Sequence, residues 1–325
     1  MPHDLRLRAQ PADGSRRPRQ RRRLLHATLA LTAVLVATGS AVGGVEVGVY
    51  QDQPAKQLNP LMAKTGRPGV LSTYVTGNQL VDPATLQLAR RRKIRLLINW
   101  MPDAGSPRAK VTATVGLRGV VRRRYDRQLR ALVAQVRTLR PAPILRPMPE
   151  MNTPWYAWSV PRKGNSAALY RQAWKRVWVI TRRGSRGRVK LMWSPYHRQI
   201  PDTPANALSR YYPGNKLVDM VGTSGYNFGN RGGLAWTNPR ALFADVYRET
   251  QALAPGKPFW IAETGSTALG GNKARWILDL RTLPSAFPNL RGLVWYDVRE
   301  RNGDFRLRDR AATTKAFKGL IKQVR

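Results

Sequence analysis

The sequence predicts a single (β/α)8 TIM barrel, an α/β fold in which strands and helices alternate. Short β-branched runs alternate with helical stretches from about Gly44 onward, and eight such runs can be counted. No internal repeat or low-complexity linker divides this part of the chain. Eight strands each followed by a helix need about 250 residues or more. The 325-residue chain therefore accommodates one barrel and an additional N-terminal segment.

Residues 1–41 are predicted to be a basic leader and signal peptide. An arginine-rich stretch ends at Arg23, and an apolar stretch from about Leu24 to Ala37 and then small residues follow. A membrane anchor through residues 24–45 is the alternative, because no charged residue lies between Arg23 and Glu46. In either case we expect the barrel, residues 44–325, to lie outside the cell, either secreted or anchored to the membrane.

The strands and helices of the barrel follow from two periodicities. Strands are expected where β-branched and aromatic residues gather in short runs, at 44–51, 69–76, 94–100, 142–150, 188–196, 218–226, 257–265 and 291–297. Helices are expected where apolar residues recur at helical spacing, most clearly at 125–139, 167–183, 239–254 and 311–324. Active sites of such barrels form at the carboxyl ends of the strands, so polar residues at those ends are the candidates for chemistry.

Charge and composition limit the function classes. The chain has 57 Lys+Arg against 18 Asp+Glu, a formal net charge of +39, of which the arginine-rich N-terminus supplies only a part. Such a field attracts nucleic acid, anionic membrane or acidic polymer. A nucleic-acid binder is one hypothesis, but no recognisable binding module is present, so no specific nucleic-acid partner is expected. The chain has no cysteine, which excludes disulfides, Cys-ligated metals and thiol nucleophiles.

Histidine is also scarce. Only His3, His26 and His197 occur, so a histidine-rich metal site is not expected and a Ser-His-Asp triad would depend on His197 alone. We therefore predict no metal and no cofactor.

Two glutamates stand at positions suited to catalysis. Glu150 and Glu263 lie at the carboxyl ends of the fourth and seventh predicted strands, which face each other across a barrel mouth. Glycosidic bond cleavage needs such a pair, one carboxyl to protonate the leaving oxygen and one to attack the anomeric carbon. Arg146 lies on the same strand face as Glu150 by alternation and can hold a carboxylate ionised. A buried structural ion pair is the other interpretation of Arg146.

Aromatic residues at the predicted strand ends suggest a sugar-stacking groove, because pyranose rings pack their C–H faces on flat apolar side chains. The residues assigned to this groove are Trp100, Trp155, Trp158, Trp193, Tyr226, Trp295 and Tyr296. For any one tryptophan, core packing is the competing interpretation. Trp174, Trp178, Trp260 and Trp276 are expected in the core, because they lie within helices or inside a strand.

The stretch RPMPEMNTPWYAW resembles the fourth-strand motif of glycoside hydrolase family 26, a barrel family known for β-mannanases. KPFWIAETGS and VDMVGTSGYN are similar to the seventh- and sixth-strand segments of that family, and weaker blocks extend from about Val45 to the C-terminus. The resemblance implies that Glu150 is the acid/base, Glu263 the nucleophile, Tyr226 the hydroxyl contacting the nucleophile and Trp295 a platform beneath the sugar. Arg146 and Asn152 fall on matching polar positions.

One position departs from the family motif. Pro149 stands where that family has histidine, so a hydrogen-bond partner for the sugar is missing next to the acid/base residue. The expected function is a retaining endo-acting β-mannanase-like glycoside hydrolase, monomeric, acting on a β-mannan or another β-glycan, neutral or acidic. A non-catalytic barrel that binds polysaccharide or cell wall is the alternative.

Overall fold

The computed structural model describes residues 44–102 and 116–323. Eight parallel strands pair in sequence order and close on themselves, with β1 pairing to both β2 and β8. The strands are β1 (Glu46–Tyr50), β2 (Val70–Thr76), β3 (Arg95–Met101), β4 (Ile144–Pro147), β5 (Lys190–Trp193), β6 (Met220–Asn227), β7 (Phe259–Ser266) and β8 (Leu290–Tyr296). The prediction of a (β/α)8 barrel is confirmed.

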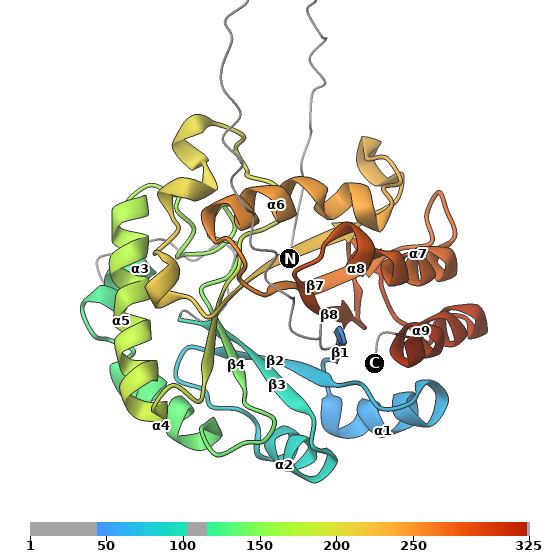
Figure 1. Ribbon diagram of the computed structural model, residues 1–325, viewed down its shortest axis with the longest axis horizontal. Coiled ribbons are helices and arrows are strands. Elements are labelled where there is room, and N and C mark those ends of the chain that lie inside the picture. The colour runs from blue at the N-terminus through green and yellow to red at the C-terminus, as the bar shows by residue number, and fades with distance from the viewer. Residues whose placement is uncertain (1–43, 103–115, 324–325) are drawn as a thin grey trace, which may run out of the picture.

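Helices surround the strands on the outside (Figure 1). They are α1 (Pro54–Thr65), α2 (Pro83–Arg92), α3 (Leu117–Val121), α4 (Asp126–Val136), α5 (Ala167–Ser185), α6 (Pro239–Leu253), α7 (Lys273–Asp279), α8 (Leu283–Ala286) and α9 (Ala311–Gln323). Several begin with a side-chain cap, as at Asp82, Ser166 and Asn238, whose oxygens accept hydrogen bonds from backbone N–H groups of the first turn. The four clearest predicted helices correspond to α4, α5, α6 and α9.

The connection between β5 and β6 departs from the expectation that every strand is followed by an α-helix. It contains only short 3-10 turns, η1 (Pro204–Asn206), η2 (Leu208–Arg210) and η3 (Asn215–Leu217). Pro201, Pro204, Pro213 and Gly214 explain this, because proline lacks the N–H that a helix needs and glycine favours turns. Further 3-10 turns are η4 (Arg231–Gly233) and η5 (Leu280–Thr282), and a small hairpin joins β9 (Arg299–Glu300) to β10 (Gly303–Asp304).

Alternation along the strands divides the core into two layers. One layer fills the barrel interior, with Val70, Leu97, Ile144, Met192, Trp260, Ala262 and Val294. The other lies between the strands and the helices, and includes Leu96, Ile98 and Leu191. Successive strand residues therefore face opposite layers. The polar site occupies the inward face above the interior layer.

The leader and the proposed anchor lie almost entirely outside the described residues, which begin at Gly44. Among residues 44–102 and 116–323, no helix is long and apolar enough to cross a membrane.

Candidate active site

Glu150 lies three residues beyond β4, where the chain turns sharply. Met148 and Glu150 both have positive φ values, of 49° and 58°, which are uncommon for residues other than glycine and concentrate at functional sites. Hydrogen bonds hold this turn: the Glu150 N–H donates to the Ser194 carbonyl at 2.9 Å, and the Trp158 indole donates to the Pro149 carbonyl at 2.8 Å. The strand thus ends earlier than predicted, and the carboxyl group of Glu150 lines the cavity at the barrel mouth.

Glu263 lies within β7, at an irregular part of the sheet. Its register partner on β6 is Ser224, and the register shifts next to this pair. A second shift between Ile261 and Thr264 interrupts the pairing of β7 with β8. Such bulges re-aim side chains near active sites. Glu263 is only 4% exposed, yet it lines the same cavity as Glu150.

Arg146 occupies the centre of the polar site. Its guanidinium donates to Asn99 Oδ1 at 2.9 Å, Ser194 Oγ at 2.9 Å, Ser224 Oγ at 2.8 Å and Glu263 Oε2 at 3.2 Å. The side chain is fully buried and does not line the cavity. The structure thus places Arg146 behind Glu263 and not in the cavity lining, which differs from its prediction as a substrate-binding residue. It contacts Glu263, so both earlier interpretations, charge support for a carboxylate and a buried ion pair, describe the same contact.

Two tyrosines complete the surroundings of Glu263. The Tyr74 hydroxyl donates to Oε2 and the Tyr226 hydroxyl donates to Oε1. Together with Arg146, three donors converge on this carboxyl group, and an ionised carboxylate accepts hydrogen bonds at both oxygens. The arrangement favours an anionic Glu263, as a nucleophile requires.

Glu150 has a different environment. The Ser224 hydroxyl donates to its Oε1, and Glu150 is only 6% exposed. Burial, followed by the nearby charge of Glu263, raises the pKa of Glu150 to about 7, against the lowering effects of Arg146 and of the Ser224 hydrogen bond. At neutral pH Glu150 can therefore hold or release a proton, which suits a general acid/base. Glu150 thus has a raised pKa, whereas Glu263 accepts hydrogen bonds from three donors.

The two carboxyls lie in one open cavity of about 320 Å³. Aromatic side chains form much of its lining, namely Trp155, Tyr196, Tyr226, Phe228, Tyr296 and Phe305. Of the predicted groove residues, the structure brings Trp155, Tyr226 and Tyr296 to this cavity. Such rings offer flat apolar faces with polar edges, which suit sugar rings.

Four predicted groove tryptophans belong to the core instead. Trp100, Trp158, Trp193 and Trp295 are each at most 1% exposed and pack in the apolar layer between strands and helices. Strand alternation gives the reason, since Asn99 and Tyr296 point inward and their neighbours Trp100 and Trp295 point outward. Tyr296 thus lines the cavity where Trp295 was expected to form the sugar platform.

Asn152 is also placed differently from its prediction as a substrate-binding residue. Its amide nitrogen donates to the carbonyls of Tyr196 and Arg198 at 3.0 and 3.1 Å, and its oxygen accepts from the Tyr196 N–H at 2.8 Å. The side chain is fully buried and is not part of the cavity lining. Asn152 therefore ties the segment after β4 to the segment after β5, because all its polar atoms are used by the backbone.

Several site residues were missed at the sequence level. Tyr74 and Ser224 contact the two glutamates, and Ser224 lies two residues before the predicted Tyr226, on the same strand face. That period-two spacing was a signal that could have identified Ser224. Other missed residues lie in the connections that follow β5, β6 and β8 and carry no such signal. They are His197, Arg198, Arg231, Glu300 and Phe305.

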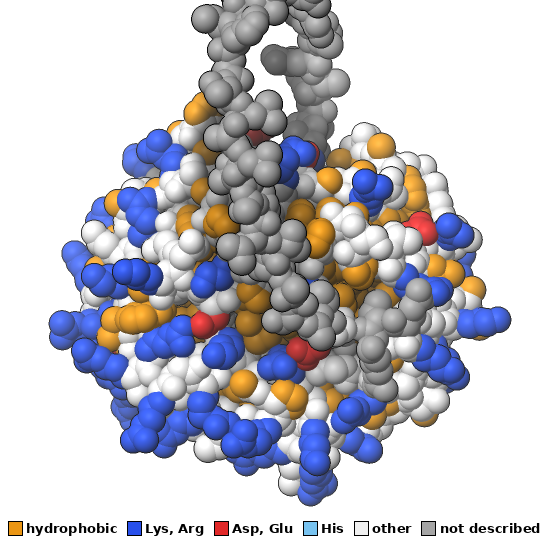
Figure 2. Space-filling view, in the orientation of Figure 1, with side chains coloured by type: hydrophobic (Ala, Val, Ile, Leu, Met, Phe, Trp, Pro, Cys, Tyr) orange, Lys and Arg blue, Asp and Glu red, His pale blue; other side chains and the backbone are white. Residues whose placement is uncertain are grey.

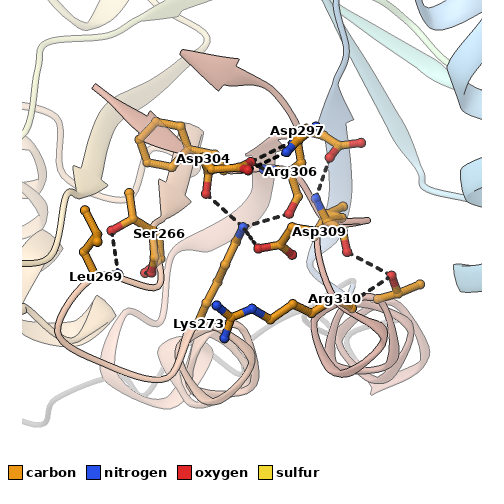
Figure 3. A network of polar contacts seen from close by, with 12 residues as sticks. Ser266, Leu269, Lys273, Asp297, Asp304, Arg306, Asp309 and Arg310 are labelled. Carbon is orange, nitrogen blue, oxygen red and sulfur yellow. Dashed lines mark hydrogen bonds and ion pairs between the residues drawn. The ribbon is translucent and has the colours of Figure 1, made fainter. Parts of the chain in front are cut away.

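The segment after β8 forms one wall of the cavity and is held from behind by Lys273 (Figure 3). The ammonium group of Lys273, on α7, donates to the Asp304 and Arg306 carbonyls at 2.9 and 2.7 Å and to Asp309 Oδ2 at 3.0 Å. Lys273 is only 3% exposed. From β8, the Trp295 indole donates to the Phe305 carbonyl at 2.7 Å. These bonds position Phe305 against the cavity.

Comparison with known proteins agrees with this geometry. Residues 115–250, which include Glu150, match the model of glycosyl hydrolase family 26. The match covers 136 of the 325 residues, so over this segment the chain is similar to family 26. This confirms the resemblance seen in the fourth-strand motif.

Curated relatives match this chain over part of their own length. It is 30% identical over 182 residues to Endoglucanase H of Acetivibrio thermocellus, covering 54% of this chain and 20% of that protein. It is 30% identical over 126 residues to a mannan endo-1,4-beta-mannosidase of Bacillus subtilis, covering 38% of this chain and 30% of that protein. The matched regions thus span less than a third of either relative.

Solved structures of family 26 share the fold. A beta-mannanase of Bacteroides ovatus superposes with a TM-score of 0.61 at 17% identity, over 85% of this chain and 88% of that one. The catalytic domain of an endo-beta-1,4-mannanase of a Bacillus species gives a TM-score of 0.63 at 14% identity, over 86% of each chain. At such identities the likeness establishes the barrel fold.

Proposed function

We propose that this protein is a retaining glycoside hydrolase that cleaves β-glycosidic bonds within a polysaccharide, in the manner of an endo-acting β-mannanase. The observation that carries the proposal is the pair Glu150 and Glu263, which line one cavity, Glu150 with a raised pKa and Glu263 with three hydrogen-bond donors. The family 26 match and the curated relatives, two of them named mannan endo-1,4-beta-mannosidase, support the choice of reaction and substrate class.

The proposed reaction is a double displacement. In the first step Glu150 gives its proton to the glycosidic oxygen while Glu263 attacks the anomeric carbon and forms a glycosyl-enzyme. In the second step Glu150 takes a proton from water, and the water oxygen displaces Glu263. Arg146, Tyr74 and Tyr226 hold Glu263 in place throughout, because each donates a hydrogen bond to it.

Hydrolysis assays test this proposal directly. Purified protein should release sugar from at least one of a panel of β-mannan, mixed-linkage β-glucan and xylan. Glu150→Gln and Glu263→Gln should each lower kcat by at least about a thousandfold, whereas Glu249→Gln, a control on α6 outside the cavity, should leave it unchanged. NMR of the first-formed product should show the β anomer, as retention demands.

The assay also separates the enzyme from a binding protein. Release of no sugar from any substrate, together with retained polysaccharide binding, would contradict the hydrolase and support a non-catalytic wall- or polysaccharide-binding barrel. An α anomer as the first product would exclude double displacement while keeping a glycosidase.

We also propose that residues 1–41 are a leader that directs export and that residues 44–325 form the extracellular, monomeric catalytic domain. The basic stretch, apolar stretch and small residues of the leader support this. N-terminal sequencing of the protein collected from the culture medium would show cleavage near Ala41. Recovery only in the membrane fraction, with an intact N-terminus, would favour an anchor instead.

A further inference from the structure

Two arginines line the cavity beside the proposed catalytic pair. Arg198 lies in the segment after β5, and Arg231 lies in η4 after β6. β5 and β6 are neighbouring strands, paired at Met192 and Met220, so the segments that follow them leave the same side of the barrel mouth. Both side chains are exposed. They place two positive charges on one side of the opening.

Neither guanidinium is neutralised within the described part of the chain. Among residues 44–102 and 116–323, no side-chain hydrogen bond or ion pair joins Arg198 or Arg231 to an acid, whereas Arg146 is fully engaged. The carboxyls of the cavity already have donors: Arg146 and two tyrosines for Glu263, Ser224 for Glu150, and the Tyr296 hydroxyl at 2.5 Å for Glu300. The two exposed arginines are therefore available to a ligand.

The nearby histidine adds no charge to this side of the cavity. Burial, together with the neighbouring Arg198, lowers the pKa of His197 to about 3, so its ring is neutral at ordinary pH. Apolar side chains lie among these polar groups, since Ile200 and Leu234 line the same cavity. This side of the cavity thus combines apolar surface with two permanent positive charges, those of Arg198 and Arg231.

Guanidinium groups favour carboxylate and phosphate, because their planar fork can donate two parallel hydrogen bonds to such anions. We propose that the cavity accepts an anionic β-glycan, in which a carboxylate or phosphate group on a sugar pairs with Arg198 and Arg231. This inference rests on the proposed hydrolase function of the same cavity and specifies its substrate class.

The high net charge offers a competing cause for any preference for acidic polymers. Lys and Arg side chains are spread over the visible face of the molecule (Figure 2), so polyanions would be attracted without any specific site. Such long-range attraction between exposed charges is largely screened beyond about 10 Å at 0.1 M salt. Removing equal charge at two places separates the local contribution from the general one.

The test compares two double variants at 0.15 M salt. Arg198→Gln with Arg231→Gln removes the cavity cations, and Arg91→Gln with Lys318→Gln removes the same charge from exposed positions on α2 and α9. The substrates are β-1,4-linked mannohexaose, the matching hexamer of mannuronic acid, and mannohexaose phosphorylated on one sugar. Each is assayed for kcat/KM with wild type and both variants.

We expect wild type to favour at least one of the two anionic hexamers over mannohexaose by about tenfold or more. The cavity variant should lose about tenfold of the wild-type preference for that substrate over mannohexaose. The α2/α9 variant should match wild type on all three. Equal losses in both variants, or a wild type that favours mannohexaose, would overturn the inference. Whichever anion is favoured identifies the group recognised.

Calorimetric binding separates this inference from the hydrolase proposal. With Glu150→Gln protein, which keeps both arginines, an anionic hexamer should bind at least about tenfold more tightly than mannohexaose. Tighter binding of the anionic hexamer without hydrolysis by wild type would refute the hydrolase and keep the anionic ligand. Hydrolysis of mannohexaose with no preference for either anion would keep the hydrolase and refute the inference.

Discussion

Arg146 and Glu263 form an ion pair on the inward face of the barrel, with Nη1 3.2 Å from Oε2 and side-chain exposures of 1% and 5%. Burying two charges is costly unless their remaining hydrogen-bonding groups are also satisfied. Here both partners meet that condition, because Asn99, Ser194 and Ser224 accept from the arginine and two tyrosines donate to the glutamate. The pair thus places the proposed nucleophile Glu263 directly against an arginine buried in the barrel.

Arg146→Met should remove that support. The free energy of unfolding should fall by about 3–5 kcal/mol, because Glu263 would remain as a buried charge without its cation. Adding Glu263→Gln should restore part of the loss, since the uncompensated charge is then gone. Urea unfolding of both variants measures this. A single variant within 1 kcal/mol of wild type would show that the pair contributes little to stability.

Glu150→Gln should change how stability depends on pH. The pKa of Glu150 rises from 4.5 to about 7 on folding, so between these pH values the folded protein binds more protons than the unfolded chain. Wild-type stability from this group is therefore lost as pH rises from about 4.5 to 7. The variant lacks that loss, so its free energy of unfolding relative to that of wild type should rise by on the order of 2–3 kcal/mol across this range. Thermal unfolding of both proteins at pH 4 and pH 8 measures this difference. A variant that becomes less stable relative to wild type as pH rises would contradict the prediction.

Ser224→Ala should raise the pH above which kcat/KM falls. If Glu150 donates a proton in the first step, kcat/KM should fall above about pH 7, the pKa of the free enzyme's acid. The Ser224 hydrogen bond lowers that pKa, so its removal should shift the limb to higher pH. Profiles of kcat/KM against pH for both proteins measure the shift. An unchanged or lower limb would mean that Glu150 is not the titrating acid.

Trp155→Ala and Trp158→Ala should separate binding from folding. Trp155 lines the cavity and is partly buried, so its loss should raise KM by roughly threefold to tenfold with little change in stability. Trp158 is 1% exposed and stacks on Tyr156 with ring centres 4.4 Å apart, so its loss should cost about 3–5 kcal/mol of unfolding free energy. The reverse pattern would place Trp158 at the substrate.

Lys273→Met should loosen the cavity wall after β8. Lys273 holds two backbone carbonyls and Asp309, so the variant should raise KM and lower the unfolding temperature. Arg275→Met is the matched control, because Arg275 lies on the same helix but pairs with Asp279 at 74% exposure and should change stability by less than about 1 kcal/mol. Equal effects on KM in both variants would argue against a positioning role for Lys273.

Much of the fold could be predicted from the sequence because each strand and helix has its own local periodicity. α4 and α5 follow directly from the spacing of apolar residues such as Leu129 and Val133, and α5 ends at Ser185, only two residues later than predicted. The helix expected after β5 was wrong because its prolines were not weighed. Local signals therefore identified the strands and helices, and the prolines between β5 and β6 explain why no α-helix forms there.

The site was predicted less completely for a geometric reason. Glu150 and Glu263 stand out because acids are rare in this chain and both lie near strand ends. Trp100 and Trp295 were misplaced because a shift of one residue along a strand exchanges the inward and outward faces. Tyr74 and Ser224 depend on the register between β2, β6 and β7, including the bulge beside Ser224, which local patterns do not reveal.

The tether from Lys273 has a consequence for redesign of the barrel. The wall that presents Phe305 is fastened to helix α7 on the outside of the molecule as well as to β8. Substitutions on the outer helical layer can therefore tilt or relax one side of the opening while every residue within reach of a ligand stays unchanged. Directed evolution of this chain should therefore select substitutions on α7 as well as in the cleft itself.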